Sequence, residues 1–151
     1  YLFQTESSDV DLGRLSMQCG RRNDALKLFL AWREKGDAGW ARMVESYMEM
    51  ADYLESLVER TEELELVSQR EWANVCLRFV ASDGDLEFIN KKIREQLKSD
   101  GRFMVSSSKL DDKTILRPVI ANQNVSRETL DDLVYEITRI GNSIVKELPE
   151  L

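Results

Sequence analysis

The hydrophobic positions in the first part of the chain recur at the spacing of α-helices. From Asn23 to Gly36, apolar side chains stand around most of a helical circumference, which predicts a well-buried helix that the glycine ends. From Asp37 to Thr61, apolar residues recur every three or four positions, with most acidic residues between them. This pattern predicts an amphipathic helix with one solvated face. The tryptophans lie in apolar patterns and are expected in the core: Trp32, Trp40 and Trp72.

The period changes after residue 63, where short apolar runs predict strands instead of helices. The expected strands are 64–67, 74–80, 103–107 and 114–121, with a polar turn at 111–113. Pro118 cannot donate to a strand ladder, so its strand is expected at an edge of the sheet or bulged.

Two further helices are expected around these strands. One covers 86–98 and ends at Gly101, and the last begins at a Ser-x-x-Thr capping box that opens with Ser126 and runs to about Leu148. Adjacent strands with short links pair antiparallel, and helices can cover one face of the resulting sheet. The predicted fold class is therefore α+β.

Composition and charge exclude several classes of protein. A chain of 151 residues predicts one domain, and a formal net charge of -7 argues against non-specific binding of nucleic acid. No apolar run is long enough to span a membrane. Two widely spaced cysteines, Cys19 and Cys76, do not indicate a disulfide framework. We therefore expect a cytoplasmic protein with neither nucleic acid nor membrane as a partner.

The chain has no histidine, which restricts its chemistry more than any other feature. Ser-His-Asp and Cys-His triads and histidine-ligated zinc are excluded, and two cysteines cannot form a four-ligand zinc site. The sequence therefore predicts no metal site. The start at Tyr1, without an initiator methionine, suggests a piece of a longer polypeptide that supplies the missing chemistry.

Two places in the sequence could bind an anion. Cys19 and Gly20 stand before two arginines at the start of the first helix, where backbone N–H groups and guanidinium groups could converge on an anion. The alternative is a surface turn whose arginines pair with acidic neighbours. Arg78 and Arg117 each place a charge inside a predicted strand. Arg117 either points into solvent or emerges into a cleft where it holds a carboxylate, and the residues alone leave both open.

Several separate motifs resemble, in order, the C-terminal part of group II pyridoxal-phosphate-dependent amino-acid decarboxylases, with glutamate and cysteine-sulfinate decarboxylases nearest. They lie at residues 1–4, 16–28, 65–67, 74–76, 104–105, 116–122, 130–133 and 139–141. The resemblance implies the small C-terminal domain of fold type I (aspartate aminotransferase-like) enzymes, an antiparallel sheet covered by helices. Residues 1–22 would be the end of the large domain's mobile loop and its connection, and residues 23–151 the C-terminal α+β domain.

The resemblance also implies an activity. The whole polypeptide would be a homodimer with shared active sites that releases carbon dioxide and an amine from a small L-amino acid. An acidic substrate is expected: glutamate, cysteine sulfinate or aspartate. Ile115 and Leu116 replace two family phenylalanines and Pro118 follows Arg117, so 2,4-diaminobutyrate and aromatic amino acids stay open as substrates. A non-catalytic interaction domain derived from this fold is a further alternative.

Residue roles come from the same resemblance. Tyr1 matches the loop tyrosine that gives a proton to the substrate carbon after carbon dioxide leaves, acting on the partner subunit's site. Arg117 matches the arginine that holds the substrate α-carboxylate. Cys19 and Gly20 match the turn that approaches the cofactor phosphate from the neighbouring subunit. The lysine that forms a Schiff base with pyridoxal phosphate would lie upstream, so this chain alone would lack the catalytic lysine.

Overall fold

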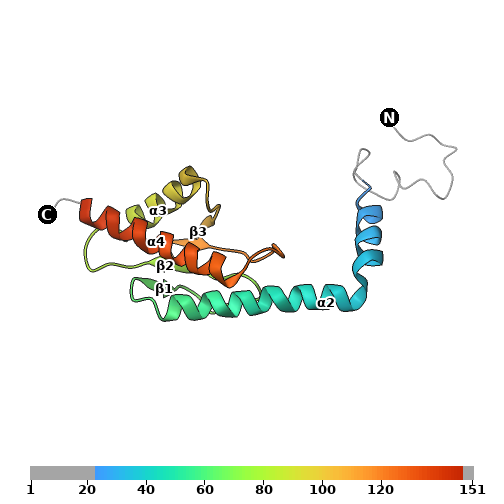
Figure 1. The fold of residues 1–151 in the computed structure, drawn as a ribbon. Coiled ribbons are helices and arrows are strands. Elements are labelled where there is room, and N and C mark those ends of the chain that lie inside the picture. Colours follow the sequence, from blue (N-terminus) through green and yellow to red (C-terminus); the bar gives the residue numbers. More distant parts are fainter. Residues whose placement is uncertain (1–22, 148–151) are drawn as a thin grey trace, which may run out of the picture. The chain divides into compact units, whose positions relative to one another are not determined.

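A computed structural model describes residues 23–147 of the chain, which divides into two compact units between Trp40 and Ala41 (Figure 1). In chain order, the elements are α2 (Asp24–Glu59), β1 (Leu64–Leu66), β2 (Leu77–Phe79), α3 (Leu86–Asp100), β3 (Ser106–Leu110), β4 (Lys113–Arg117) and α4 (Arg127–Glu147). Every predicted helix and strand in this part of the chain is present, with shifted ends.

Helix α2 combines the first two predicted helices, and its backbone is interrupted where the sequence placed the break. Gly36 has φ 63 and ψ 175, a conformation that glycine adopts without a steric penalty. The indole of Trp32 stacks on Trp40 with ring centroids 5.5 Å apart, and its Nε1–H donates to Asp37 Oδ1 at 2.7 Å. These contacts brace the chain on either side of the glycine.

The prediction that the first helix is well buried is wrong for the part of the chain that the structure describes. Leu28, Phe29 and Leu30, on the helical segment before Gly36, are 56–57% exposed. The expected tryptophan core is also wrong. Trp72 is 72% exposed and Trp32 46% exposed, and Trp40 is half-buried.

The four strands of the second unit form one antiparallel sheet in the order β1-β2-β4-β3. Strand β4 therefore lies inside the sheet, so the first predicted alternative for the proline-containing strand, a place at an edge, is wrong. The second alternative, a bulge, is also wrong, because the register is the same on both sides of Pro118, at Leu77–Leu116 and at Asn74–Val119.

The strand ends at Arg117, directly before Pro118, so the missing N–H falls outside the ladder, and the proline carbonyl accepts from Val75 N at 3.2 Å. Asp111 and Asp112 have positive φ and form the two-residue turn of the β3–β4 hairpin.

All the helices of this unit that pack on the sheet lie on one of its faces. Leu77, Phe79 and Leu116 alternate with residues of the other face and join the hydrophobic core with buried residues of α2, α3 and α4. Helices α3 and α4 run side by side over the strands (Figure 1). The predicted α+β class, an antiparallel sheet covered by helices, is confirmed.

Side chains from the first turns of α3 fill a gap between β2 and β4. These strands pair only at Leu77 and Leu116, so a longer ladder would next join Phe79 to Thr114. Instead, Phe79 N donates to Asn90 Oδ1 at 2.8 Å, and Asn90 Nδ2 donates to Phe79 O at 2.9 Å. Thr114 N donates to Glu87 Oε2 at 2.6 Å. The two side chains replace the strand partners that Phe79 and Thr114 lack.

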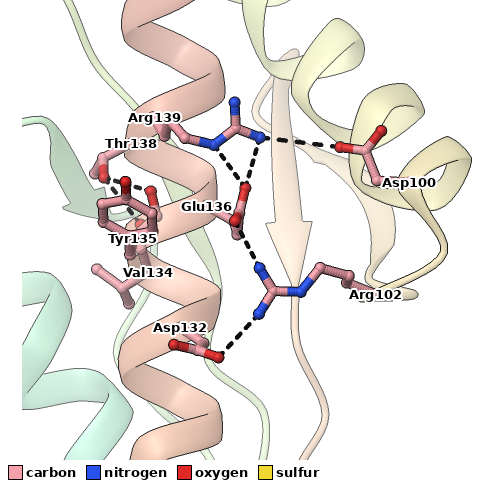
Figure 2. A network of polar contacts seen from close by, with 8 residues as sticks. All are labelled: Asp100, Arg102, Asp132, Val134, Tyr135, Glu136, Thr138 and Arg139. Atoms are coloured by element: carbon pink, nitrogen blue, oxygen red, sulfur yellow. Dashed lines mark hydrogen bonds and ion pairs between the residues drawn. The ribbon is translucent and has the colours of Figure 1, made fainter.

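A second polar cluster fastens α4 to the segment before β3 (Figure 2). Glu136 is 8% exposed, and its carboxylate accepts from Arg102 and from Arg139, each at 2.8 Å. Arg102 also reaches Asp132 at 3.0 Å, and Arg139 lies 4.0 Å from Asp100 at the end of α3. A buried carboxylate is therefore neutralised by two guanidinium groups, which hold the start of β3 against α4.

Replacing Asn90 with alanine should destabilise the fold strongly. Asn90 is fully buried, and its loss leaves the N–H and C=O of Phe79 without partners away from water. We expect Asn90→Ala to lower the free energy of unfolding by about 3 kcal/mol, measured by urea denaturation. Gln96→Ala on the exposed side of the same helix is the control and should change it by less than about 0.5 kcal/mol. A loss below about 1 kcal/mol for Asn90→Ala would contradict this role.

The carboxylate of Glu87 should make stability depend on pH in the acid range. Hydrogen bonds from Thr114 lower the pKa of Glu87 below its ordinary value of 4.5, against opposing desolvation, and the nearby Arg78 lowers it further. The stabilisation that the charged Glu87 contributes to the fold is therefore present above about pH 4.5. It is lost as the pH falls through the lowered pKa that Glu87 has in the folded state.

In urea unfolding at pH 7, Glu87→Gln should have a lower free energy of unfolding than the parent chain. This deficit should be smaller at pH 3. Glu128→Gln, in the first turn of α4, is the control and should give a smaller difference at both pH values. An equal deficit of Glu87→Gln at pH 7 and pH 3 would mean that the charge of Glu87 does not stabilise the fold.

Candidate functional site

The face of the sheet opposite the core carries the predicted substrate-binding arginine. Leu116 points into the core, so its neighbours Ile115 and Arg117 belong to the other face of β4. At β2, the same alternation places Arg78, and Cys76 directly before the strand, on this face, on either side of the core residue Leu77. We call this side of the sheet the open face.

A groove of about 410 Å³ runs along the open face. It is lined by Ser68, Gln69, Glu71, Asn74, Cys76, Ser108, Lys109, Leu110, Ile115 and Arg117. Arg117 is exposed and has no acidic partner within 4 Å among residues 23–147. Its main-chain oxygen accepts from Ser106 Oγ at 2.9 Å, which fixes the backbone of the strand end that carries it. The guanidinium is thus available to an anion from outside.

Arg78 differs from Arg117 although both are strand arginines of the open face. Arg78 is 5% exposed, with Nε 3.4 Å from Glu65 and a terminal nitrogen 3.8 Å from Glu87. Two carboxylates neutralise it, so it has a structural role between β1 and α3. This distinction could not be made from the sequence, where both are single charges inside apolar strands.

The loop between β1 and β2 forms one wall of the groove and is anchored by Arg70. Its Nε donates to Glu55 of α2 at 2.8 Å, a second nitrogen pairs with Asp52, and a third donates to the main-chain oxygen of Trp72 at 2.7 Å. The hydrogen bond with Glu55 is the main cause of the raised pKa of Arg70. No local pattern marks this anchor, because Arg70 lies in a polar loop far from both acids along the chain.

Apolar side chains stand beside Arg117 at the end of the sheet. Val119 pairs with Asn74 in an isolated bridge and is 49% exposed, and Met104, two residues before Ser106, is 86% exposed. Met104 and Val119 each stand two residues beyond the paired strand ends Ser106 and Arg117. An anion held by Arg117 would therefore have exposed apolar residues nearby along both strands.

The other predicted site residues fall outside the structural description. Tyr1, Cys19 and Gly20 lie in residues 1–22, outside the described residues, as does the possible anion turn that contains the last two. Of the predicted site residues, Arg117 is the one that the described residues place.

Residues 23–147 bear on two kinds of function, metal binding and membrane insertion. There, no three side chains of the metal-binding types converge on a common point. No helix in the same range has an apolar stretch that could cross a bilayer.

Comparison with known proteins identifies the family. The model of the pyridoxal-dependent decarboxylase conserved domain matches residues 1–80. Mouse CSAD has a similar structure, with a TM-score of 0.80 and 30% identity over 93% of this chain and 32% of that one. Catharanthus roseus tryptophan decarboxylase, solved with L-tryptophan, has a TM-score of 0.79 and 24% identity over 89% of this chain and 29% of its own.

A third similar structure is bacterial. The glutamate decarboxylase domain of a Vibrio parahaemolyticus diaminobutyrate-pyruvate transaminase and L-2,4-diaminobutyrate decarboxylase has a TM-score of 0.75 and 21% identity, over 80% of this chain and 26% of that one. The chain therefore spans about a third or less of these solved chains.

Three findings agree with the resemblance seen in the motifs. They are the fold with its open-face groove, the family match over more than half of the chain, and the structure shared with these enzymes. The cofactor of this family is pyridoxal phosphate. The chain belongs to the pyridoxal-dependent decarboxylase family.

Proposed function

We propose that this chain is the C-terminal portion of a pyridoxal-phosphate-dependent L-amino-acid α-decarboxylase that releases carbon dioxide and an amine. The observation that carries the proposal is Arg117, an exposed arginine without an acidic partner among the described residues, in a groove on the open face. Family membership supplies the cofactor chemistry, and the groove supplies a place for a carboxylate.

The role of Arg117 follows from the geometry of its side chain. A guanidinium binds a carboxylate through two parallel hydrogen bonds, which fixes the plane of that group. Pyridoxal phosphate, when bound, acts as an electron sink for the bond that breaks. Arg117 would hold the α-carboxylate so that this bond lies perpendicular to the cofactor ring, and Ser106 would keep the strand end in place.

The described residues do not themselves form a cofactor site. The residues expected at the cofactor phosphate, Cys19 and Gly20, lie outside the described residues, and the lysine that binds the cofactor would precede this chain. In the proposed enzyme, the described part therefore contributes substrate binding, and pyridoxal phosphate is held by the rest of a cytoplasmic homodimer with shared active sites.

The resemblance of the sequence to glutamate and cysteine-sulfinate decarboxylases favours an acidic substrate: glutamate, cysteine sulfinate or aspartate. In the groove, Arg117 is the basic residue of the open face and Glu71 is the acidic residue among the lining residues. Lys109 also borders the groove, but it pairs with Thr114, so its side chain belongs to the core face of β3. The exposed Met104 and Val119 beside Arg117 favour a second candidate, an aromatic amino acid.

Tyr1 would act after carbon dioxide has left. A phenol with a pKa of about 10 is a neutral acid at physiological pH and can give its proton to the substrate carbon. We propose that Tyr1 does so in the partner subunit's site, as part of a loop that also excludes water.

Assaying the full-length polypeptide against glutamate, cysteine sulfinate, aspartate, 2,4-diaminobutyrate and tryptophan tests the function and its substrate class. We expect carbon dioxide release to be fastest with one of the three acidic substrates. Arg117→Lys should lower kcat/KM about 10- to 100-fold for every substrate that is turned over, because a point charge replaces a bidentate fork that binds the shared α-carboxylate.

The exposed Arg42→Lys is the matched control and should leave kcat/KM unchanged. A loss confined to acidic substrates would move Arg117 from the α-carboxylate to the side-chain carboxylate. No carbon dioxide release from any of these amino acids would refute the proposed activity.

Tyr1→Phe in the same full-length polypeptide separates the proton donor from the rest of the site. Cofactor binding, followed by visible absorbance, should survive because phenylalanine keeps the ring. Amine release should fall about 100-fold or more, since the ring no longer carries a proton to donate. Tyr135→Phe, on an exposed position of α4, is the control and should behave as the parent enzyme. Unchanged amine release by Tyr1→Phe would remove Tyr1 from the mechanism.

A further inference from the structure

Helix α3 carries a stripe of basic side chains along one of its faces. Lys91, Arg94 and Lys98 follow Glu87 at spacings of four, three and four residues, so these side chains share one face of the helix. We call the three cations the basic stripe. Lys91 and Lys98 are exposed and Arg94 is half-buried. None of the three has an acidic partner within 4 Å among residues 23–147.

The acidic residues close to the basic stripe are already engaged. Glu87 accepts from Thr114 N at 2.6 Å, and Glu95 pairs with Lys92 at 3.0 Å. Arg94 Nε is shielded from water and has no hydrogen-bond partner in the part of the chain that the structure describes. The chain as a whole has a net charge of -7, so the composition does not account for uncompensated positive charge on this helix.

The contacts of α3 with the sheet show which way the basic stripe faces. Asn90 contacts β2 through Phe79, and Glu87 contacts the next strand, β4, through Thr114. At about 100° per residue around the helix, the basic stripe lies on the same side of Asn90 as Glu87 does. The direction from Asn90 to Glu87 therefore crosses the sheet from β2 to β4, and the strand beyond β4 is β3. The basic stripe faces the β3 edge of the sheet.

A fourth cation, on β3 itself, lies beside the basic stripe. Lys109 pairs with Thr114, so its side chain belongs to the core face, the side of the sheet on which α3 lies. The pKa of Glu87 is lowered mainly by hydrogen bonds from Thr114, and to a lesser degree by the charge of Lys109, which places this lysine near the first turn of α3. Over residues 23–147, Lys109 also lacks an acidic partner within 4 Å.

Strand β3 is an open edge of the sheet. Among the described strands it pairs with β4 alone, and Ser106, Ser107 and Ser108 are exposed. Sheet edges are commonly protected by proline, by a bulge or by several charged residues on the strand. The register of β3 with β4 is continuous, and Lys109 is the single charged residue of β3. Small serine side chains therefore leave room for a further strand.

The spacing of strands determines what such a strand would meet. It would lie about 4.8 Å beyond β3 and would bind through main-chain hydrogen bonds. Every second side chain would point to the side of the sheet on which α3 lies, toward the basic stripe and Lys109. Acidic side chains at these alternate positions would meet four cations.

A second copy of this chain does not suit the edge. Two β3 strands paired about a two-fold axis would bring together two basic stripes and two Lys109 side chains. Like charges on adjacent strands destabilise their pairing. The occupant is therefore a segment of opposite charge.

We propose that β3 and the basic stripe of α3 form a docking surface for an extended acidic segment of a partner protein, which adds to the edge of the sheet as a further strand. Charge complementarity selects acidic residues at alternate positions, and the open edge supplies the main-chain hydrogen bonds. The basic stripe belongs to the side of the sheet opposite the face of Arg117. The proposal goes beyond the proposed reaction and does not depend on it.

Binding of a fluorescein-labelled peptide of alternating glutamate and threonine to the full-length polypeptide tests the charge of the surface. Fluorescence anisotropy should show binding, and a peptide with lysine in place of glutamate should bind about 10-fold or more weakly. The double variant Lys91→Gln/Lys98→Gln should weaken binding of the acidic peptide about 5-fold or more. The control Lys92→Gln/Lys146→Gln removes the same charge from exposed positions outside the basic stripe and should change the affinity less than about 2-fold.

Two N-methylated versions of the acidic peptide test the added strand. Alternate N–H groups of a strand point to opposite sides, so methylation of either the glutamate or the threonine nitrogens removes the hydrogen bonds with β3. One of the two methylated peptides should bind about 10-fold or more weakly than the other.

Each of four results would overturn the proposal. They are no binding at about 100 μM protein, unchanged affinity of Lys91→Gln/Lys98→Gln, equal affinities of the two methylated peptides, and displacement by inorganic phosphate as effective as by unlabelled peptide. The last result would show a site for simple anions instead of a strand. The measurements contain no amino-acid substrate, so failure of the proposed function leaves them intact.

Discussion

The amide of Asn90 holds the sheet together at the point where its own hydrogen bonds stop. It donates to the carbonyl of Phe79 and accepts from the N–H of the same residue, so one side chain takes the place of a neighbouring strand. A third hydrogen bond, to the carbonyl of Leu86, holds the amide in its own helix at 2.9 Å. Without this replacement, two buried backbone groups would lose their partners, at a cost comparable to a large part of a domain's stability.

The contacts of α3 with the strands also link the two faces of the sheet. Because α3 inserts Asn90 and Glu87 between β2 and β4, the helix is tied to the strands by polar contacts as well as by apolar packing. The carboxylate of Glu87 also lies 3.8 Å from Arg78, so the same helix turn neutralises a buried charge of the open face. The core and the buried arginine of the open face therefore depend on one set of contacts, although they belong to opposite sides of the sheet.

Local patterns predicted the elements well, since their causes lie close together along the chain. The capping box at Ser126 forms as expected, with Thr129 N donating to Ser126 Oγ at 3.2 Å, and Gly101 ends α3 with φ 72. Contacts between distant residues were not predictable, because nothing local marks Asn90 as a strand substitute. The predictions of solvent exposure failed for a related reason. An apolar pattern around Trp32 indicates that the side chain should be buried, but it does not indicate which part of the protein buries it.

The site was predictable only in part, and the two strand arginines show why. Arg78 and Arg117 have similar neighbours in sequence, yet acids from β1 and α3 neutralise the first. An arginine whose guanidinium is already paired with carboxylates has few hydrogen-bond donors available to a substrate. An exposed arginine without an acidic partner is not desolvated on folding, and its charge and donors are available for binding. Which arginine is free depends on where Glu65 and Glu87 lie in space. The family resemblance selected Arg117, and the distribution of acids around the sheet supplies a physical reason for that choice.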